Sequence, residues 1–233
     1  MRLCRIVGLV PQSRTYGVSP AGSIDAVAGA WRGPRWRDVP FLTIDNAMGD
    51  PPAHRPQAQA KIAYDDAALR VIFRVEDRYV RSRVTTYQGP VCTDSCVELF
   101  FTPGPDVAQG YFNIEANCGG TVLFMHQKAR GVECVPLSEA DGVSLALTHT
   151  MPAVIEPEIA GPVEWLIEYR VPYAVLSGYA RVTTPAPGVT WKANLYKCAD
   201  QCSHPHWLTW SPVDWPRPDF HRPEFFGTLT FSA

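Results

Sequence analysis

Hydrophobic and polar residues alternate in the segment 91–102, VCTDSCVELFFT, and this pattern predicts a β-strand. Successive side chains of a strand point to opposite faces. One face of this strand carries Val97, Leu99 and Phe101. The other face carries Cys96, Glu98 and Phe100. Because an unpaired carboxylate is costly to bury, we expect Glu98 either to meet a cation or hydrogen-bond donors or to line a surface that takes a polar ligand.

The segment 111–117, YFNIEAN, repeats the alternation. Its apolar face consists of Phe112, Ile114 and Ala116. Its polar face consists of Tyr111, Asn113, Glu115 and Asn117. If the two strands lie side by side, Glu98 shares a sheet face with these polar residues, and such a face suits the recognition of hydroxyl groups.

Similar patterns predict the other elements of the fold. We expect further strands at residues 39–44, 60–64, 69–75, 121–125, 143–150, 164–171, 191–197, 207–211 and 228–232. Gly119 and Gly120 predict a hairpin turn between 111–117 and 121–125, because glycine accepts the positive φ angles of such turns. We expect a helical turn at 172–176, an irregular connection at 77–90, and an N-terminal extension at 1–30 with a loop and a short helix before Trp31. The sequence therefore predicts an all-β fold, a single antiparallel β-sandwich domain of about ten strands with minor helical turns over residues 1–233.

Composition narrows the function only by exclusion. The net charge of −2 does not favour nucleic acid or an anionic membrane as a partner. No segment approaches the ~20 consecutive apolar residues of a membrane-spanning helix. The N-terminus fits a signal peptide poorly, and seven cysteines is an odd count for a disulfide framework, so reduced thiols in the cytoplasm are the default expectation. The oligomeric state is not indicated.

The main candidate site is the polar sheet face with nearby aromatic residues. Its polar members are Glu98, Asn113, Glu115, Asn117, Asn194 and Lys197. Its aromatic members are Trp207, Trp210, Trp215 and Phe220. Arg83 could reach a carboxylated sugar. The alternative interpretation is a solvated outer face whose aromatic residues belong to the core, since such alternation is ordinary in half-exposed sheets.

Two other constellations could carry chemistry. Cys198, Cys202, His204 and His206 place four zinc-type ligands within nine residues, although their spacing fits no common zinc motif. Cys92 and Cys96 could contribute if the two loops meet; separate thiols or a disulfide are the alternatives. Glu98 and Glu115 could act as the paired carboxylates of a glycoside hydrolase. No phosphate loop, dinucleotide fingerprint or Ser-His-Asp arrangement is present.

The order of several segments resembles that of family 9-like carbohydrate-binding modules, within the wider group of DOMON-related β-sandwiches. The resemblance covers about residues 60–233 and rests on LRVIFRVEDRYV, TDSCVELFF, YFNIEAN, WKANLY, WLTWSP and DFHRPEFFGTLTF together. It implies non-catalytic binding of a mono- or oligosaccharide, linked to carbohydrate catabolism, by aromatic rings that clamp the sugar and polar groups that bond its hydroxyls.

The resemblance also implies roles for single residues. Glu98 matches the glutamate that bonds the sugar, and Asn113 falls where other members use an arginine. Phe220 falls where one clamping tryptophan sits, and Cys92 lies near the place of the other. A cysteine cannot stack on a sugar ring. The second ring would then come from Tyr87, Trp207 or Trp215, or the ligand is different.

The sequence predicts no cofactor, and the same resemblance leaves two alternatives open. Some family members bind calcium, although no local loop here spells out a calcium site. Some DOMON relatives bind haem, for which Met125, His126 and His149 are the candidate axial ligands.

Overall fold

The structure is a computed structural model of the chain, and it describes residues 12–21 and 31–233. Strands make up most of this part of the chain: β1 (Thr15–Pro20), β2 (Leu42–Ile44), β3 (Asn46–Ala47), β4 (Gln57–Tyr64), β5 (Ala68–Ser82), β6 (Cys96–Thr102), β7 (Tyr111–Asn117), β8 (Val122–Gln127), β9 (Val135–Pro136), β10 (Thr148–His149), β11 (Ile155–Pro172), β12 (Thr190–Cys198), β13 (Trp207–Thr209) and β14 (Gly227–Phe231). The helices are short: α1 (Glu139–Ser144), α2 (Tyr173–Ser177) and 3-10 turns at Val91–Thr93, Val107–Gln109 and Pro223–Phe225. The predicted all-β class is confirmed.

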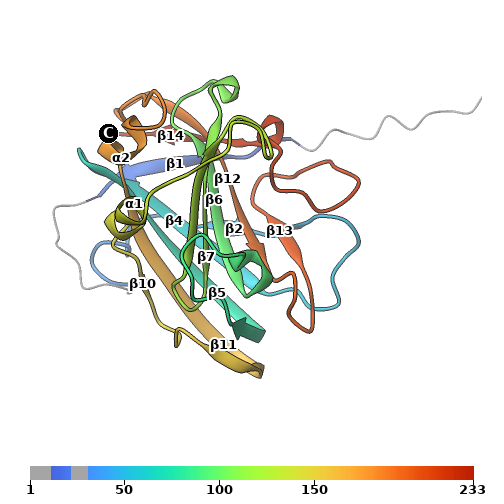
Figure 1. Ribbon diagram of the computed structural model, residues 1–233. Coiled ribbons are helices and arrows are strands. Elements are labelled where there is room, and N and C mark those ends of the chain that lie inside the picture. Colours follow the sequence, from blue (N-terminus) through green and yellow to red (C-terminus); the bar gives the residue numbers. More distant parts are fainter. Residues whose placement is uncertain (1–11, 22–30) are drawn as a thin grey trace, which may run out of the picture.

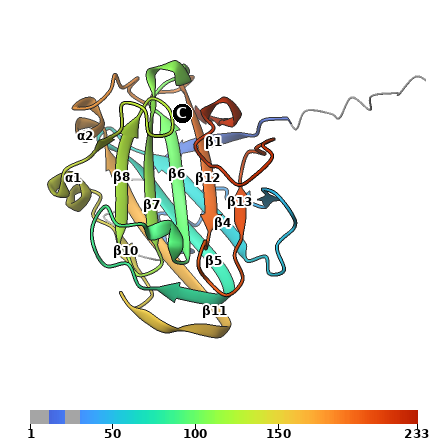
Figure 2. The same ribbon diagram turned by 45° about the vertical axis from the view of Figure 1, so that its right-hand side comes forward.

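The strands form a mixed sheet that curls so that two halves face each other (Figures 1 and 2). One half contains β10, β11, β5, β4 and β2; the other contains β14, β12, β6, β7, β8 and β9, with β13 and β3 beside β12. Strand β1 joins the halves, because it pairs in parallel first with β14 and then with β4. The predicted antiparallel sandwich of about ten strands therefore differs from the observed arrangement, which has more strands and parallel pairing at β1.

The main core lies between the two halves. The half with β6, β7 and β12 contributes Val97, Leu99, Phe101, Phe112, Ile114, Ala116, Trp191, Ala193 and Leu195. The half with β5 and β11 contributes Val71, Phe73, Val75, Trp165, Ile167 and Tyr169. Burying each large apolar side chain stabilises the fold by ~1.5–3 kcal/mol. The apolar sets predicted from alternation for the segments 91–102 and 111–117 are confirmed.

Several predicted elements differ from the observed ones. Most of the strand expected at 143–150 is replaced by α1 and the turn after it, because the Ser138 hydroxyl accepts from the Asp141 N–H and the Asp141 carboxylate accepts from the Ser138 N–H. The connection expected at 77–90 is strand as far as the end of β5. The β7–β8 hairpin is confirmed, with Gly120 at a φ of 89°, and the helical turn is confirmed as α2. Much of the predicted N-terminal extension, including its helix, lies outside the described residues.

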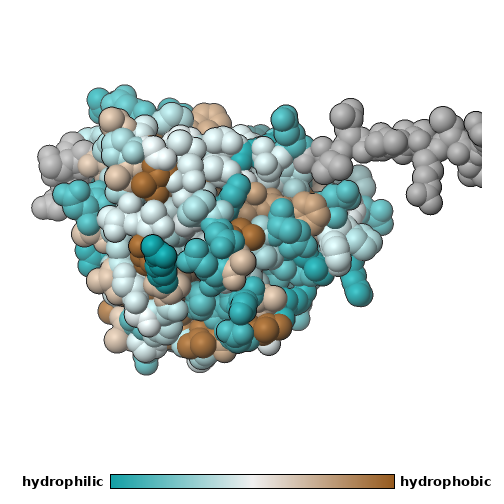
Figure 3. Space-filling model, turned by 90° about the horizontal axis from the view of Figure 1, so that it is seen from above, coloured by the Kyte–Doolittle hydropathy of each residue, from teal (hydrophilic) through white to brown (hydrophobic). Residues whose placement is uncertain are grey.

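The surface shows no continuous apolar face in the view of Figure 3, where hydrophobic residues form small patches among hydrophilic ones. The exposed large apolar residues of the described ranges are scattered: Phe41, Val132, Val135, Val143 and Val154. None of the helices in the described part of the chain has the length and hydropathy that a membrane crossing needs.

Candidate functional site

The polar face of β6, β7 and β12 is covered by loops rather than open to solvent. Cys96, Phe100, Tyr111 and Tyr196 form a second buried cluster there with residues of the covering loops. Beside this cluster lies a pocket of ≈ 110 Å³. Its floor and walls come from Cys92, Glu98, Glu115, Arg130, Cys198, Asp200, Trp207, Pro218, Asp219, Phe220 and His221. The predicted polar face is therefore covered by loops, with a hollow beside the buried cluster.

Two carboxyl groups meet inside this pocket. Glu98 on β6 and Glu115 on β7 are direct partners in the antiparallel register, and their residues are 2% and 7% exposed. Burial and the neighbouring Glu115 raise the pKa of Glu98 well above its ordinary value. Burial raises the pKa of Glu115 to about 7, although the Asn113 amide, which donates to Glu115 Oε1 at 3.0 Å, opposes the shift. Near neutral pH the pair therefore retains protons that ordinary glutamates lose, and it can both donate and accept hydrogen bonds.

A neutral histidine faces the same pocket. His221 Nδ1 lies 2.8 Å from the Tyr111 hydroxyl and 3.2 Å from Gln127 Nε2. Burial and the nearby Arg130 lower the pKa of His221 to about 4. With Nδ1 accepting from these donors, the imidazole proton resides on Nε2. Arg130 itself is held by Asp219, 2.9 Å from its carboxylate.

Aromatic rings form part of the pocket wall. Trp207 stands at the start of β13, and its indole Nε1 donates to Asp200 Oδ1 at 2.8 Å. Burial raises the pKa of Asp200. The ring of Phe220 stacks on Tyr196 with centroids 4.1 Å apart. Both rings are therefore fixed in place before any ligand enters.

Some of the residues predicted for a sugar surface meet at this pocket. Glu98, Glu115, Trp207 and Phe220 line it. Asn113 lies behind it and orients Glu115. Asn117 and Asn194 are on the same sheet face but hydrogen-bond to neighbouring loops.

The other predicted residues lie elsewhere. Lys197 points to the opposite side of β12, where its ammonium is 2.7 Å from His206 Nε2 and 3.6 Å from Asp77 Oδ2. Trp210 belongs to the main core. Arg83 is on the surface, 2.9 Å from the Glu156 carboxylate. The two further ring candidates are also away from the pocket lining: Tyr87 donates to Leu137 and Ser138 carbonyls, and Trp215 lies under the Arg222 guanidinium.

The candidate zinc ligands do not converge. Cys202 Sγ is 3.7 Å from the Ser95 hydroxyl, and His204 stacks on Tyr79. His206 accepts from Lys197, and a fixed ammonium at that nitrogen excludes a metal ion. Among the described residues, the metal-type ligands that gather are instead Cys96, Glu98 and Cys198.

The metal-type group found among the described residues does not match calcium, and two of the three haem candidates have other contacts. Calcium takes six to eight oxygen ligands, and the mixed sulfur and oxygen group of Cys96, Glu98 and Cys198 does not fit it. His126 packs on Phe112, whereas His149 bonds the Met151 carbonyl. Calcium and haem binding, with Met125 as the third haem candidate, stay predictions.

Four polar pocket residues were missed by sequence reasoning: Arg130, Asp200, Asp219 and His221. All four come from loops, where alternation carries no signal. Closeness in sequence to predicted site residues could have indicated three of them. Asp200 lies inside the Cys198–His206 segment, and Asp219 and His221 flank Phe220.

The family model of carbohydrate-binding family 9 matches residues 35–231. This chain belongs to carbohydrate-binding family 9. The resemblance stated from the sequence is thereby confirmed. None of the curated proteins compared with this family 9 chain matches it.

Solved structures resemble this family 9 chain over nearly its whole length. A Bacteroides uniformis protein described as a candidate carbohydrate-binding protein is 27% identical, with a TM-score of 0.83, and the match covers 95% of this chain and 100% of that one. A family 9 module from Caldicellulosiruptor kristjanssonii, in complex with glucose, is 14% identical with a TM-score of 0.62, covering 94% and 96%. The cellotriose complex of a family 9 module from the same organism has the same identity and TM-score, covering 94% of each chain. At 14% identity, these last two structures show only that their fold is similar to that of this chain.

Proposed function

We propose that this chain binds a mono- or oligosaccharide in the pocket beside β6, β7 and β12 and performs no chemistry on it. The observation that carries the proposal is the combination of two fixed aromatic rings, Trp207 and Phe220, with two hydrogen-bonding carboxyl groups, Glu98 and Glu115, in one pocket of a family 9 chain. Aromatic rings cover the apolar face of a sugar, while carboxyl groups bond its hydroxyls. A role in carbohydrate catabolism stays part of this proposal.

The size and chemistry of the pocket favour one sugar ring at a time. A volume of ≈ 110 Å³ is small beside the pockets of about 300–1,000 Å³ that hold larger ligands. Hydrogen-bond donors are available from the protonated carboxyl groups, Arg130 and His221 Nε2. Acceptors are available from Asp200 and Asp219. We therefore propose that a longer saccharide places one ring in the pocket and leaves the rest outside.

Trp207 takes the place of the missing ring near Cys92 in this proposal. Both residues line the pocket, and the thiol of Cys92 offers no flat surface for stacking. Because related structures contain glucose and cellotriose, these two saccharides are the first ligands to test.

Removing Glu98 or Trp207 is expected to weaken saccharide binding by ~10–100-fold each. Glu98→Ala deletes a hydrogen-bonding group and leaves its partner on the sugar unsatisfied, at a cost of about 1–3 kcal/mol, and Trp207→Ala deletes a stacking surface. Calorimetric titration with glucose and cellotriose measures both losses.

Arg83→Ala is the matched control for these variants. Arg83 was also predicted as a sugar ligand, but its guanidinium pairs with Glu156 at the surface. This variant should bind like the unmodified protein. Equal affinities in all the variants would contradict the assignment of the pocket.

Hydrolysis is a second candidate function, favoured by one observation. Glu98 and Glu115 are opposed in one pocket and both have raised pKa values, and glycosidases use paired carboxyl groups in which one is protonated. Incubation with cellotriose followed by chromatography tests it. The binding proposal expects no shorter products, and their release, abolished in Glu115→Gln, would replace it.

A further inference from the structure

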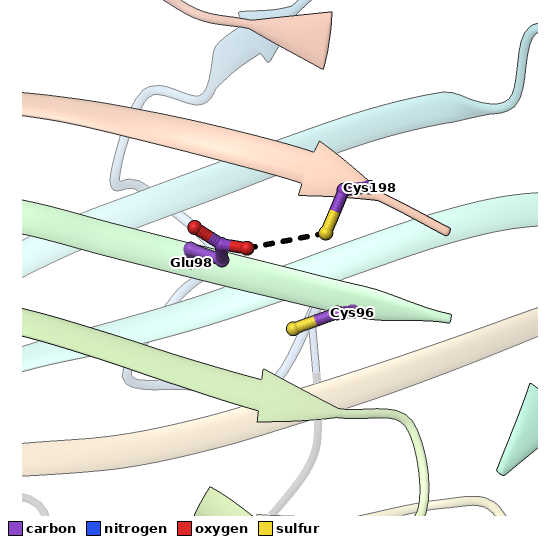
Figure 4. A group of neighbouring side chains, drawn as sticks. All are labelled: Cys96, Glu98 and Cys198. Atoms are coloured by element: carbon purple, nitrogen blue, oxygen red, sulfur yellow. Dashed lines mark hydrogen bonds between the residues drawn. The ribbon is translucent and has the colours of Figure 1, made fainter. Parts of the chain in front are cut away.

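Two thiols and a carboxyl group converge at the floor of the pocket. Cys96 and Cys198 are direct partners in the antiparallel pairing of β6 with β12, and Glu98 is two residues along β6 from Cys96. Figure 4 shows the three side chains together, with Glu98 and Cys198 joined by a hydrogen bond. One ligand atom from each lies within 4.8 Å of the other two, and Cys198 Sγ is 3.1 Å from Glu98 Oε1.

These distances are close to those around a small tetrahedral ion. Zinc bonds of about 2.0–2.3 Å to sulfur and oxygen place neighbouring ligand atoms about 3.6–3.8 Å apart. The observed group therefore needs shifts of about an ångström or less to close around an ion. Such shifts are within the reach of side-chain rotation.

The three groups have little else to bind. Within the described part of the chain, Cys96 Sγ hydrogen-bonds to the Val97 carbonyl, at 3.7 Å, and to the Cys198 thiol, while Cys198 Sγ also contacts the Cys92 carbonyl, at 3.7 Å, and Glu98. All three residues are buried. Among the described residues, no ion pair includes Glu98. A buried carboxyl group that faces a pocket without a cation keeps its proton, and a cation bound beside it would displace that proton and restore the carboxylate.

The rest of the pocket lining also has more carboxyl groups than cations to pair with them. Glu115 and Asp200 also line it without an ion pair among the described residues, and Arg130 is already paired with Asp219. A cation at the floor would offset this acidic excess. Lys197 cannot do so by direct contact, because its ammonium lies on the other side of β12.

We propose that Cys96 Sγ, Cys198 Sγ and a Glu98 carboxylate oxygen form a site for a thiophilic divalent cation of the zinc type. The mixed sulfur and oxygen set suits zinc, which accepts both, better than calcium or magnesium, which require oxygen. Cys96 lies behind the pocket lining, whereas Glu98 and Cys198 form part of it. The fourth position of the ion therefore faces the pocket, open to water or to a ligand.

This site differs from the ligand set predicted from local spacing. Of the four clustered ligands predicted from local spacing, only Cys198 takes part, and Cys96 comes from the second cysteine pair that was expected to contribute if the two segments meet. The partners of Cys198 come from β6, about a hundred residues earlier in the chain. The metal proposal can be tested independently of the saccharide proposal, because the metal is titrated in the absence of sugar.

The test is titration of the reduced, chelator-treated full chain with cadmium ions, which report thiolate coordination through ultraviolet charge-transfer absorption, and with zinc in competition. We expect one ion per chain, displaced by zinc, and loss of the absorption in Cys96→Ser and Cys198→Ser. Cys202→Ser is the matched control, because Cys202 is buried nearby but outside the group, and it should bind cadmium like the unmodified chain.

Glu98→Gln keeps the experiment decisive if a serine variant fails to fold. This isosteric change removes the oxygen ligand and is expected to weaken cadmium at least tenfold while the thiolate absorption persists at saturation. Near-ultraviolet circular dichroism checks that each variant is folded. The proposal is overturned if the reduced chain shows no thiolate absorption, or if the absorption survives Cys96→Ser and Cys198→Ser. Loss of sugar binding with intact cadmium binding would reject only the saccharide proposal.

Discussion

Asp77→Asn is expected to lower the free energy of unfolding by about 3–5 kcal/mol, since it leaves the buried Lys197 ammonium without its carboxylate. The side chains of Asp77 and Lys197 are both 0% exposed and their charged atoms are 3.6 Å apart. Burial alone would raise the pKa of Asp77, but Lys197 and the Arg78 N–H outweigh it and hold that pKa below its ordinary value. Urea denaturation followed by tryptophan fluorescence measures the loss.

His206 cannot replace the missing charge. Burial and Lys197 lower the pKa of His206 to about 3, so the imidazole is neutral near pH 7 and acts only as an acceptor for Lys197. The matched control is Lys128→Met at an exposed pair, Lys128 with Glu133, which are 56% and 70% exposed. Exposed pairs contribute about 0–1 kcal/mol. Similar losses in both variants would show that the Asp77–Lys197 pair is not a buried charge pair in solution.

Glu115→Gln is expected to flatten the decline of stability between pH 4.5 and pH 7. Below about pH 4.5 the carboxyl is protonated in both the folded and the unfolded chain. Above it the unfolded chain releases the proton, whereas the folded chain keeps it up to a pKa of about 7. The free energy of unfolding therefore falls by ~3 kcal/mol in total between pH 4.5 and pH 7. Above pH 7 this contribution is constant. Glutamine mimics the protonated carboxyl, so the variant should be the more stable protein at pH 8 and nearly equal at pH 4.

Melting temperatures recorded from pH 4 to pH 8 give this comparison. Glu139→Gln, at an exposed position of α1, is the control and should leave the decline unchanged. A decline of equal size in Glu115→Gln and the unmodified chain would mean that Glu115 is ionised in the folded protein. Since Glu98 interacts with Glu115, part of the decline should remain in Glu115→Gln and disappear in a double Glu98→Gln, Glu115→Gln variant.

The core of the sheet was predictable from the sequence because its signal is local. Val97, Leu99 and Phe101 alternate with Cys96 and Glu98, and the period of two is enough to divide them between the faces. The same rule also placed Glu98 and Glu115 on one face. Local patterning therefore located both the core and the acidic pair at the pocket.

Long-range contacts were not predictable in this way. Lys197 was predicted on the polar face, but it shares the inner face with Leu195. A lysine is tolerated there only because Asp77 of β5 and His206 of the loop before β13 reach it. The pocket walls come from loops such as residues 199–206 and 211–222, whose paths depend on what they cover. The parallel pairing of β1 has no local signature at all. The capping residues Ser138 and Asp141, by contrast, were a local signal for a helix in place of a strand.

Strand β1 has a consequence for how the protein is made. Thr15 pairs with Thr228, and Val18 with Phe231, so an early strand finds its main partner in one that the ribosome synthesises more than two hundred residues later. Until β14 emerges, the edges of β1 and β12 that await it stay unpaired. Contacts of such high sequence separation slow folding, and unpaired strand edges invite association between chains. The two halves of the sheet can therefore be joined through β1 only after β14 has been synthesised.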